Sequence, residues 1–432
     1  MPRTCMPRRF YVTLPCFMCS AAPYSALRRC AAAAVAAAVV LAVPLSARVL
    51  APDEVRALWV VRTSLTSPPA VTTMVETARA SGFNTLLVQI RGRADAYYSN
   101  ALEPRAAALA AQPDFDPLAA TIARAHGAGL RVHAWINVNL VAGVNELSAA
   151  RDHVIYRHPE WLMVPRPIAE DLLAVDPRSP EYLGRLARYV RSQPAELEGL
   201  YLSPIADASA DYTASVVRDI VTRYAIDGVH FDYVRYPNEE FDYSRDALGA
   251  FRRSLIRELP PDAARGYDRR LAAEPFVYTQ AFPDAWRAFR AAQMTGLMAR
   301  LRDTTRAARP SATVSAAVSP DAAEAATRRL QDWRTWLDRD LIDVICPMAY
   351  TADGSVFTSQ IAAAHEIAGR TPIWAGIGAY RLSSDQIVEN IQAARRLGAG
   401  GVILFSYDSL TSPSRGPEYL THIARAAFSP QF

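Results

Sequence analysis

The chain has 432 residues, of which 51% are hydrophobic and 21% charged, a composition typical of a globular protein with a large core. The formal net charge is +4, but residues 1–47 hold five arginines and no acid, so the remainder is close to −1. This balance argues against a nucleic-acid-binding protein.

The N-terminal segment has the pattern of a secretory signal. Its arginines precede an apolar run from Ala31 to Val43, and the small residues Ser46 and Ala47 follow. The run is short for crossing a bilayer. We therefore expect residues 1–47 to be a signal peptide or, alternatively, an uncleaved N-terminal anchor. The protein is then exported, to the periplasm, the envelope or the medium, and meets a membrane only through this segment.

The remainder contains a single cysteine, Cys346, because the other four lie in or beside the N-terminal segment. An exported protein with one cysteine forms no internal disulfide, so its packed core has to hold it together.

From residue 57 the chain alternates short β-rich runs with helical patterns. The expected strands are 57–63, 83–90, 130–138, 227–234, 312–319, 341–350, 371–380 and 400–407. Eight strands separated by helices predict a (β/α)₈ barrel over residues 48–432, with active-site residues at the carboxyl ends of the strands. An open doubly wound sheet is the alternative, but no glycine-rich phosphate loop follows the first strand.

Two connections are too long for a minimal barrel. Residues 139–198 follow the third strand and residues 238–275 follow the fourth. Loops of this length are usually functional or form small substructures. Because both leave from carboxyl ends, we predict that they wall a cleft.

The third strand alternates strictly between apolar and polar side chains. Val132, Ala134 and Ile136 are expected to face the helices, whereas the opposite face points into the barrel or its mouth. That inward face carries His133, Trp135 and Asn137. The indole of Trp135 suits the apolar face of a sugar, and His133 is either a site residue or a hydrogen-bonded core histidine.

The fourth strand, in the stretch AIDGVHFDYVRYP, repeats this alternation. His230 and Asp232 are expected to point inward, with Asp232 nearer the carboxyl end. Asp227 precedes Gly228 at the other end and is expected to form a structural turn. Asp232 is the predicted catalytic carboxylate.

An ion pair between Asp232 and either Arg91 or Arg235 is the structural alternative to catalysis. On the second strand, Gln89 and Arg91 are expected to share a face, and Arg93 and Asp95 follow. These side chains order a substrate or the carboxylate, or else belong to a solvated loop.

Glycoside hydrolysis needs two carboxyl groups that flank the scissile bond. Asp321 after the fifth strand and Asp353 after the sixth are candidates for the second one, although each can equally be a helix cap or a solvated charge. The sequence contains no HExxH and no GxSxG motif. We therefore predict neither a metal, nor a cofactor, nor a serine nucleophile.

Several stretches together resemble the glycosyl hydrolase-like family 10, which includes divisome-localised glycosidases and related exported barrel proteins. They are ALWVVR, FNTLLVQIRGRADAYYS, FDPLAATIARAHGAGLRVHAWIN, DGVHFDYVRYP, DWRTWLDRDLIDVICPMAY and GVILFSY, in family order over most of residues 56–410. The resemblance implies a (β/α)₈ barrel of the glycoside hydrolase superfamily and activity on glycan, which is peptidoglycan in the studied branch.

The family motifs fall on particular positions of this chain. The FDDY-type strand end matches residues 231–233, where Asp232 is retained and Tyr233 replaces the second aspartate. The QVRP-type end matches residues 89–91, and the HAW motif matches 133–135. The departure at Tyr233 weakens any mechanism that needs both aspartates.

The sequence thus predicts an exported glycoside hydrolase that acts on a polysaccharide such as cell-wall glycan. Asp232 would be the nucleophile or transition-state stabiliser, and Asp353 or Asp321 the acid. The expected substrate-binding residues are Arg91, Asp95, His133, Trp135, Asn137, His230, Tyr233, Arg235, Tyr350, Trp374 and Tyr407. The competing hypothesis is a barrel that binds glycan at the envelope without cleaving it.

Overall fold

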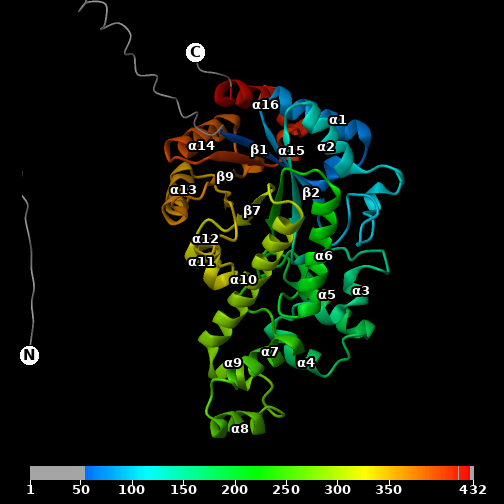
Figure 1. Ribbon diagram of the computed structural model, residues 1–432, viewed down its shortest axis with the longest axis vertical. Coiled ribbons are helices and arrows are strands. Elements are labelled where there is room, and N and C mark those ends of the chain that lie inside the picture. Colours follow the sequence, from blue (N-terminus) through cyan, green and yellow to red (C-terminus); the bar gives the residue numbers. More distant parts are fainter. Residues whose placement is uncertain (1–53, 417, 429–432) are drawn as a thin grey trace, which may run out of the picture. The chain divides into compact units, whose positions relative to one another are not determined.

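Eight parallel strands close into a barrel in the computed structural model, which describes residues 54–416 and 418–428 (Figure 1). Strand β1 pairs in parallel with both β2 and β10, and this double pairing closes the sheet. The barrel strands are β1 (Val55–Val60), β2 (Thr85–Arg91), β3 (Arg131–Asn137), β6 (Gly228–Asp232), β7 (Thr313–Val318), β8 (Val344–Ala349), β9 (Trp374–Ile377) and β10 (Gly401–Phe405). The predicted (β/α)₈ fold is confirmed, whereas the predicted signal segment lies outside the described residues.

Helices that follow the strands cover the outside of the barrel. They are α1 (Pro68–Ala80), α2 (Pro117–Gly127), α6 (Asp207–Arg223), α10 (Pro283–Ala308), α11 (Ala322–Arg328), α12 (Trp333–Asp338), α13 (Gly354–Ala368), α14 (Ser384–Arg396), α15 (Tyr407–Leu410) and α16 (Glu418–Ile423). Ser67 and Asp116 cap α1 and α2, each followed by a proline that suits the first helical turn. Among the described residues, no helix is both long enough and apolar enough to span a membrane.

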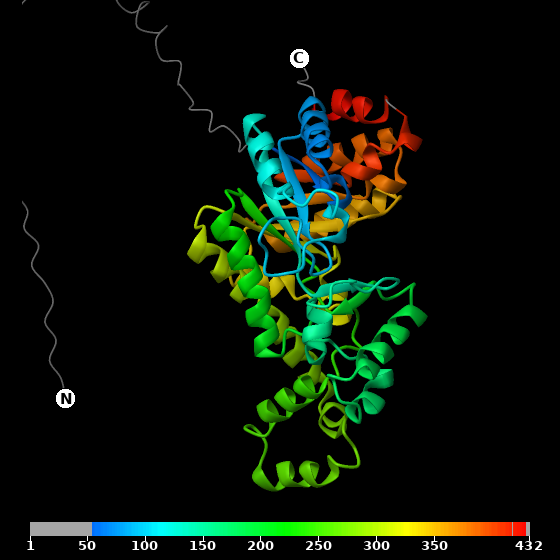
Figure 2. The ribbon, with the colours of Figure 1, turned by 90° about the vertical axis from the view of Figure 1, so that its right-hand side faces the viewer.

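Both long connections form substructures, as predicted. The first contains β4 (Leu140–Gly143), α3 (Val154–Arg157), α4 (Arg166–Leu173), α5 (Pro180–Ser192) and β5 (Gly199–Tyr201), with β4 and β5 antiparallel. The second contains α7 (Arg245–Leu255), α8 (Pro261–Arg270) and α9 (Val277–Ala281). Figures 1 and 2 show α7, α8 and α9 on the opposite side of the barrel strands from α1, α2 and α16.

The two insertions are joined by buried polar contacts. One oxygen of the buried Asp242 carboxylate accepts hydrogen bonds from the backbone N–H groups of Val164 (2.9 Å) and Ser244 (2.8 Å). Phe251 and Trp286, with ring centroids 4.9 Å apart, belong to a small apolar core under α7. Asp242 of the second insertion is therefore hydrogen-bonded to the first insertion at Val164.

The core has two layers, as expected for a barrel. Val132, Ala134 and Ile136 pack between the sheet and the helices, whereas Trp135 belongs to a separate cluster inside the barrel. This inner cluster also contains Trp59. The alternation that the sequence predicted for the third strand is confirmed.

Asp227 lies at the amino-terminal end of the barrel strands, where its carboxylate has the structural role that the sequence predicted. Its Oδ2 accepts a hydrogen bond from the backbone N–H of Val132 at 2.7 Å and lies 2.8 Å from Nε2 of His126. The carboxylate thus joins the start of β6 to the start of β3, so its structural role is confirmed.

Gly228 is expected to be intolerant of a side chain, because a Cβ there would lie 2.5 Å from Nδ1 of His133 and 2.7 Å from the carbonyl oxygen of Thr313. Overpacking a buried strand in this way should lower the free energy of unfolding of Gly228→Ala by about 1–3 kcal/mol. Urea denaturation measures the change. The matched control is Gly296→Ala on the exposed side of α10, where nothing lies within 4 Å, and it should gain about 0.5–1 kcal/mol. Equal stability of Gly228→Ala and the natural protein would contradict the packing described here.

Candidate active site

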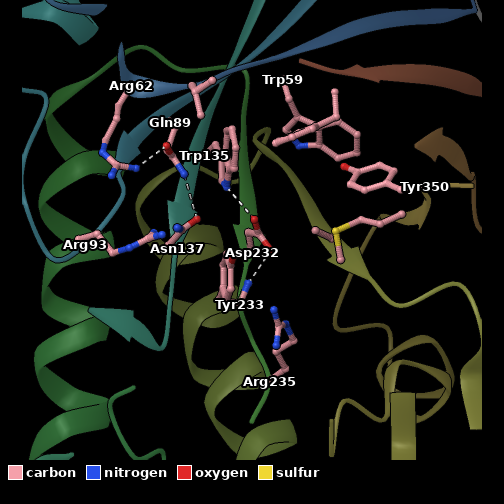
Figure 3. A pocket seen from close by; sticks show the side chains of 14 residues that line it. Trp59, Arg62, Gln89, Arg93, Trp135, Asn137, Asp232, Tyr233, Arg235 and Tyr350 are labelled. Carbon is pink, nitrogen blue, oxygen red and sulfur yellow. Dashed lines mark hydrogen bonds between the residues drawn. The ribbon is translucent and has the colours of Figure 1, made fainter. Parts of the chain in front are cut away.

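A cavity of about 230 Å³ opens at the carboxyl ends of the barrel strands (Figure 3). Its lining comes from β1, β2, β3, β6, β7, β8 and β10 and from the loops that follow them. Among the described residues that line this cavity, Asp232 is the only carboxylate. The structure thus brings together six of the predicted site residues, which are Trp135, Asn137, Asp232, Tyr233, Arg235 and Tyr350.

Asp232 is buried, with 7% of its surface exposed, and is hydrogen-bonded on both oxygens. Oδ2 accepts from Nε1 of Trp135 at 3.2 Å, and Oδ1 accepts from the backbone N–H of Tyr233 at 2.7 Å. Burial raises the pKa of this carboxyl to about 6, although Arg235 and the two hydrogen bonds act in the opposite direction. A carboxyl that keeps its proton up to this pH is suited to donate it.

The ion pairs that were the alternative for Asp232 are not formed. Arg91 pairs with Glu103 at 2.6 Å, and Arg235 pairs with Glu198 at 2.8 Å. No ion pair within the described residues includes Asp232.

Tyr233 has an unusual backbone that aims it at Asp232. Its φ of 55° lies in the left-handed region, which is strained for a residue with a bulky side chain. The turn directs its N–H to Asp232, and its ring lies 4.5 Å from the guanidinium carbon of Arg235. Such strain at a cavity is characteristic of functional sites.

Aromatic rings form one wall of the cavity. Tyr350 stacks on Phe405 at 5.4 Å and meets Trp59 edge to face at 6.1 Å. Tyr380, which is 43% exposed, extends this group outward, 6.2 Å from Tyr350. Flat apolar rings with an exposed member suit the apolar face of a sugar.

The two strand histidines lie below the cavity and do not line it. Nε2 of His230 accepts the indole N–H of Trp59 at 3.0 Å, so its Nδ1 carries the hydrogen that faces Ser315 Oγ at 3.0 Å. Burial lowers the pKa of His230 to about 3 and that of His133 to about 4, so both are neutral. The expectation that they contact substrate is corrected: His230 orients Trp59, and His133 is the core histidine of the alternative interpretation.

Trp374 and Tyr407 were also expected to bind substrate, and neither lines the cavity. Trp374 lies on the barrel floor with its ring 5.4 Å from that of His133. Tyr407 begins α15 and packs in the outer layer between sheet and helices. Both rings are buried in the hydrophobic core.

Arg91 is turned away from the cavity by an irregularity in β2. The register of β2 against β3 shifts between Gln89, which pairs with Trp135, and Arg91, which pairs with Ile136. The extra residue places Gln89 on the cavity wall and buries Arg91 completely against Glu103. The expectation that Gln89 and Arg91 share a face fails because a β-bulge interrupts the period of two.

The two aspartates proposed as a second catalytic carboxylate are helix caps. Asp321 accepts the N–H of Glu324 at 2.9 Å to cap α11, and Asp353 accepts the N–H of Ser355 at 2.8 Å to cap α13. Both caps are exposed, and neither lines the cavity. This expectation is corrected, because a carboxylate directly before a helix satisfies the free N–H groups of its first turn.

Asp95 lies beside the site rather than within it. It accepts the backbone N–H of Arg93 at 2.7 Å and lines an adjoining cavity.

The sequence interpretation missed Trp59, Arg62, Phe405 and Glu198. Trp59 and Phe405 sit within the runs ALWVVRT and GGVILFSY, where alternation with buried neighbours would have placed them inside the barrel. Arg62 begins a short 3₁₀ helix (Arg62–Leu65) rather than continuing the expected strand, and Glu198 lies in a loop, so strand alternation applies to neither. Their position follows only from the folded chain.

Glu198 and Asp232 are carboxylates with opposite shifts. Burial acts to raise the pKa of Glu198, but the ion pair with Arg235 and the hydrogen bond from Tyr201 outweigh it, so that pKa is lowered overall. Arg235 therefore stands between an ionised carboxylate and one that holds its proton. Among residues 54–416 and 418–428, no three His, Cys, Asp or Glu side chains converge as metal ligands.

The chain matches one family and several curated relatives. The profile of "Glycosyl hydrolase-like 10" matches residues 54–192 and 187–392. Glycosyl hydrolase YngK of Bacillus subtilis is 25% identical over 272 residues, which are 55% of this chain and 46% of YngK. Glycosyl hydrolase DigH of Escherichia coli is 26% identical over 165 residues, 35% of this chain and 30% of DigH. The similarity therefore spans less than half of either relative.

Solved structures with the same fold include two glycoside-degrading domains. The PgaB (BpsB) glycoside hydrolase domain from Bordetella bronchiseptica superimposes with a TM-score of 0.59 at 14% identity, covering 88% of this chain and 100% of that domain. The catalytic domain of β-amylase from Paenibacillus polymyxa gives 0.58 at 10% identity, covering 88% and 98%. At these identities the likeness concerns the barrel fold.

The Asp232 carboxyl is expected to titrate near pH 6, because burial disfavours its charged form. The folded protein then binds a proton between pH 4 and 6 that the unfolded chain has released, so stability falls as pH rises through this window. Relative to Asp232→Asn, the natural protein should lose about 2 kcal/mol between pH 4 and 7. Urea denaturation of both proteins at several pH values measures this difference, and parallel curves would contradict the raised pKa.

Glu198→Gln is expected to lower the pKa of Asp232. Glutamine keeps a hydrogen-bond acceptor for Arg235 but removes the negative charge that offsets it, so the guanidinium acts more strongly on Asp232. Carbon-13 NMR of the Asp232 carboxyl should then show a midpoint clearly below that of the natural protein. An unchanged midpoint would mean that Glu198 and Asp232 are not coupled through Arg235.

Proposed function

The chain belongs to the glycosyl hydrolase-like 10 family, and from this premise we propose that it hydrolyses glycosidic bonds of a polysaccharide with Asp232 as the proton donor. The observation that carries the proposal is a buried carboxyl with a pKa near 6 at the mouth of a barrel, beside an aromatic wall. A general acid needs a proton to give at the working pH, and burial supplies that condition.

The proposed reaction begins with a sugar whose apolar face lies on the rings of Tyr350 and Phe405, which Trp59 supports from the barrel interior. The glycosidic oxygen then lies within reach of the Asp232 carboxyl, which protonates it as the bond breaks. The indole N–H of Trp135 and the backbone N–H of Tyr233 keep the carboxyl in one orientation and stabilise the carboxylate after proton transfer.

The complementary carboxylate in this proposal is Glu198. It is kept ionised by Arg235 and lines a second cavity, which shares Arg62 and Arg93 with the first. In this proposal the ionised Glu198 is the general base, which takes a proton from the water that attacks the anomeric carbon while Asp232 protonates the departing glycosidic oxygen.

A glycan-binding barrel that does not cleave is the second candidate function. It is favoured because Asp232 is the sole carboxylate among the described residues that line its cavity, and because Tyr233 stands where the family motif has a second aspartate. In that case the aromatic wall and the arginines bind the sugar chain, and Asp232 supplies a hydrogen-bonding group.

The substrate we propose is peptidoglycan glycan, on the strength of family membership and of an N-terminal segment with the pattern of an export signal. Export brings the protein to the compartment that contains this polymer.

Incubation with purified, peptide-free glycan strands should produce new reducing ends. Asp232→Asn is expected to reduce the rate at least about a hundredfold, because it removes the general acid. The rate of the natural protein should fall as pH rises through about 6, where Asp232 loses its proton.

The matched control is Asp353→Asn, which makes the same chemical change at an exposed helix cap that asparagine also satisfies. It should cleave at the natural rate. Equal rates for Asp232→Asn and the natural protein would overturn the role of Asp232, whereas strands bound but left uncut by the natural protein would establish the binding barrel.

A further inference from the structure

Two arginines lie where the cavity of Asp232 meets the adjoining one. Arg62 and Arg93 line both this cavity and a neighbouring one of about 480 Å³. In the described ranges, neither guanidinium forms an ion pair with a carboxylate. We call Arg62 and Arg93 the arginine pair.

Neutral groups hold the arginine pair in place. Nη1 of Arg62 donates to Oε1 of Gln89 at 3.0 Å, and its side chain is also hydrogen-bonded to Tyr97. Nη1 of Arg93 donates to the carbonyl oxygen of Gly92 at 2.8 Å. Gly92 also leaves the space that Arg62 occupies, because a Cβ there would lie 2.5 Å from Nη1 of Arg62. The two cations are therefore positioned without being neutralised.

On the wall of the Asp232 cavity, the arginine pair and Arg235 stand against a single carboxyl group among the described residues. Burial lowers the pKa of Arg93 most strongly and the nearby charge of Arg62 also lowers it, while Tyr233, Tyr201 and Asp95 act to raise it. One carboxylate oxygen of Asp95 accepts a hydrogen bond from the backbone N–H of Arg93. On the cavity wall itself the remaining charges are Asp232 and Arg235, and Arg235 is already paired with Glu198 outside that cavity. No side chain on the wall of this cavity forms an ion pair with either arginine among the residues described.

The side chains of the neighbouring cavity form no ion pair with the arginine pair either. Besides the arginine pair, its charged side chains are Asp95, Arg105, Glu146 and Glu198, and Asp95 forms no ion pair within the described residues. Arg105 donates to the carbonyl oxygens of Gln112 and Phe115, and Glu198 is engaged by Arg235. Glu146 is exposed and makes no ion pair within the described residues.

We propose that the arginine pair is a subsite for the carboxylate of an acidic sugar, so that the glycan this site takes carries a negative charge next to the bond at Asp232. The proposal rests on the function proposed above and adds the class of substrate. Guanidinium groups are the donors best matched to a carboxylate, because each offers two parallel N–H groups at the spacing of its oxygens.

The placement of the arginine pair fits a chain that crosses the mouth. Figure 3 shows Arg62 and Arg93 on one side of Asp232 and Trp59 and Tyr350 on the other. A sugar stacked on the rings and an acidic neighbour at the arginine pair would bring the bond between them to Asp232. Two kinds of sugar carboxylate meet this description: the ring carboxylate of a hexuronic acid and the lactyl ether of a muramic acid.

The test compares acidic glycans with neutral counterparts of the same length. The probes are oligogalacturonate and its methyl ester, and peptide-free muramyl glycan strands and their methylamide. Calorimetric binding to the purified protein should be at least about tenfold tighter for the acidic member of one pair, since charge-assisted hydrogen bonds are lost in the neutral member. That preference should weaken as salt rises. The pair that shows it identifies the source of the carboxylate.

Arg62→Gln combined with Arg93→Gln should abolish the preference, whereas Arg93→Lys should retain part of it by keeping the charge. The matched control is Arg302→Gln, which removes one charge from an exposed ion pair with Asp303 and should leave the preference unchanged. Salt dependence is measured on the unmodified protein, so a failure of any variant to fold does not prevent the test.

Acidic and neutral probes that bind or are cleaved equally well would overturn the acidic-sugar subsite and leave the proposed function standing. Failure of every probe to be bound or cleaved would overturn both. If the preference for the acidic probe persists in the protein that lacks both arginines, another group recognises the carboxylate and the proposed subsite is wrong.

Discussion

A fully buried ion pair ties together the segments that build the mouth of this barrel. Nε and Nη2 of Arg91 donate to the two carboxylate oxygens of Glu103 at 2.7 and 2.6 Å, and Nη1 donates to the carbonyl oxygen of Val138 at 3.0 Å. The hydroxyl of Tyr212 in α6 donates a further hydrogen bond to Oε1 of Glu103 at 3.0 Å. Taking two charges out of water costs several kcal/mol per ion, so the pair persists only because nearly every donor and acceptor is satisfied. The ends of β2 and β3, the loop at Glu103 and α6 are thereby joined. Arg93 and Asn137, which line the cavity, are close in the chain to Arg91 and Val138 of this network.

Beside this ion pair, the mouth of the barrel contains two features that oppose stability. Asp232 is buried where its charged form is disfavoured, and Tyr233 adopts a left-handed backbone to give it a hydrogen bond. Below it, His230 and His133 are neutral and support the rings. Sites of this kind hold a perturbed carboxyl at the expense of stability, which the packed barrel core provides elsewhere.

The strand interiors were the most predictable part of the molecule. In the third and fourth barrel strands, side chains alternate between two environments, so Trp135 and Asp232 could be assigned to the inside from sequence alone. The same rule failed for Arg91, because one extra residue in β2 reverses the alternation and nothing in the local sequence marks it. It also could not separate a catalytic aspartate from a helix cap. Asp321 and Asp353 follow strands just as an active-site acid would, and each precedes a helix whose free N–H groups it satisfies.

The sequence by itself determined the barrel, its family, the two insertions and the central carboxylate, because these depend on periodic patterns and motifs that are local along the chain. Tertiary structure decided which charged side chains form ion pairs and which do not. Glu103 neutralises Arg91 and Glu198 neutralises Arg235, while Arg62 and Arg93 remain without a carboxylate among the residues described. The reason is physical: the electrostatic state of a side chain depends on burial and on partners brought from distant parts of the chain, and neither can be read from its neighbours in sequence.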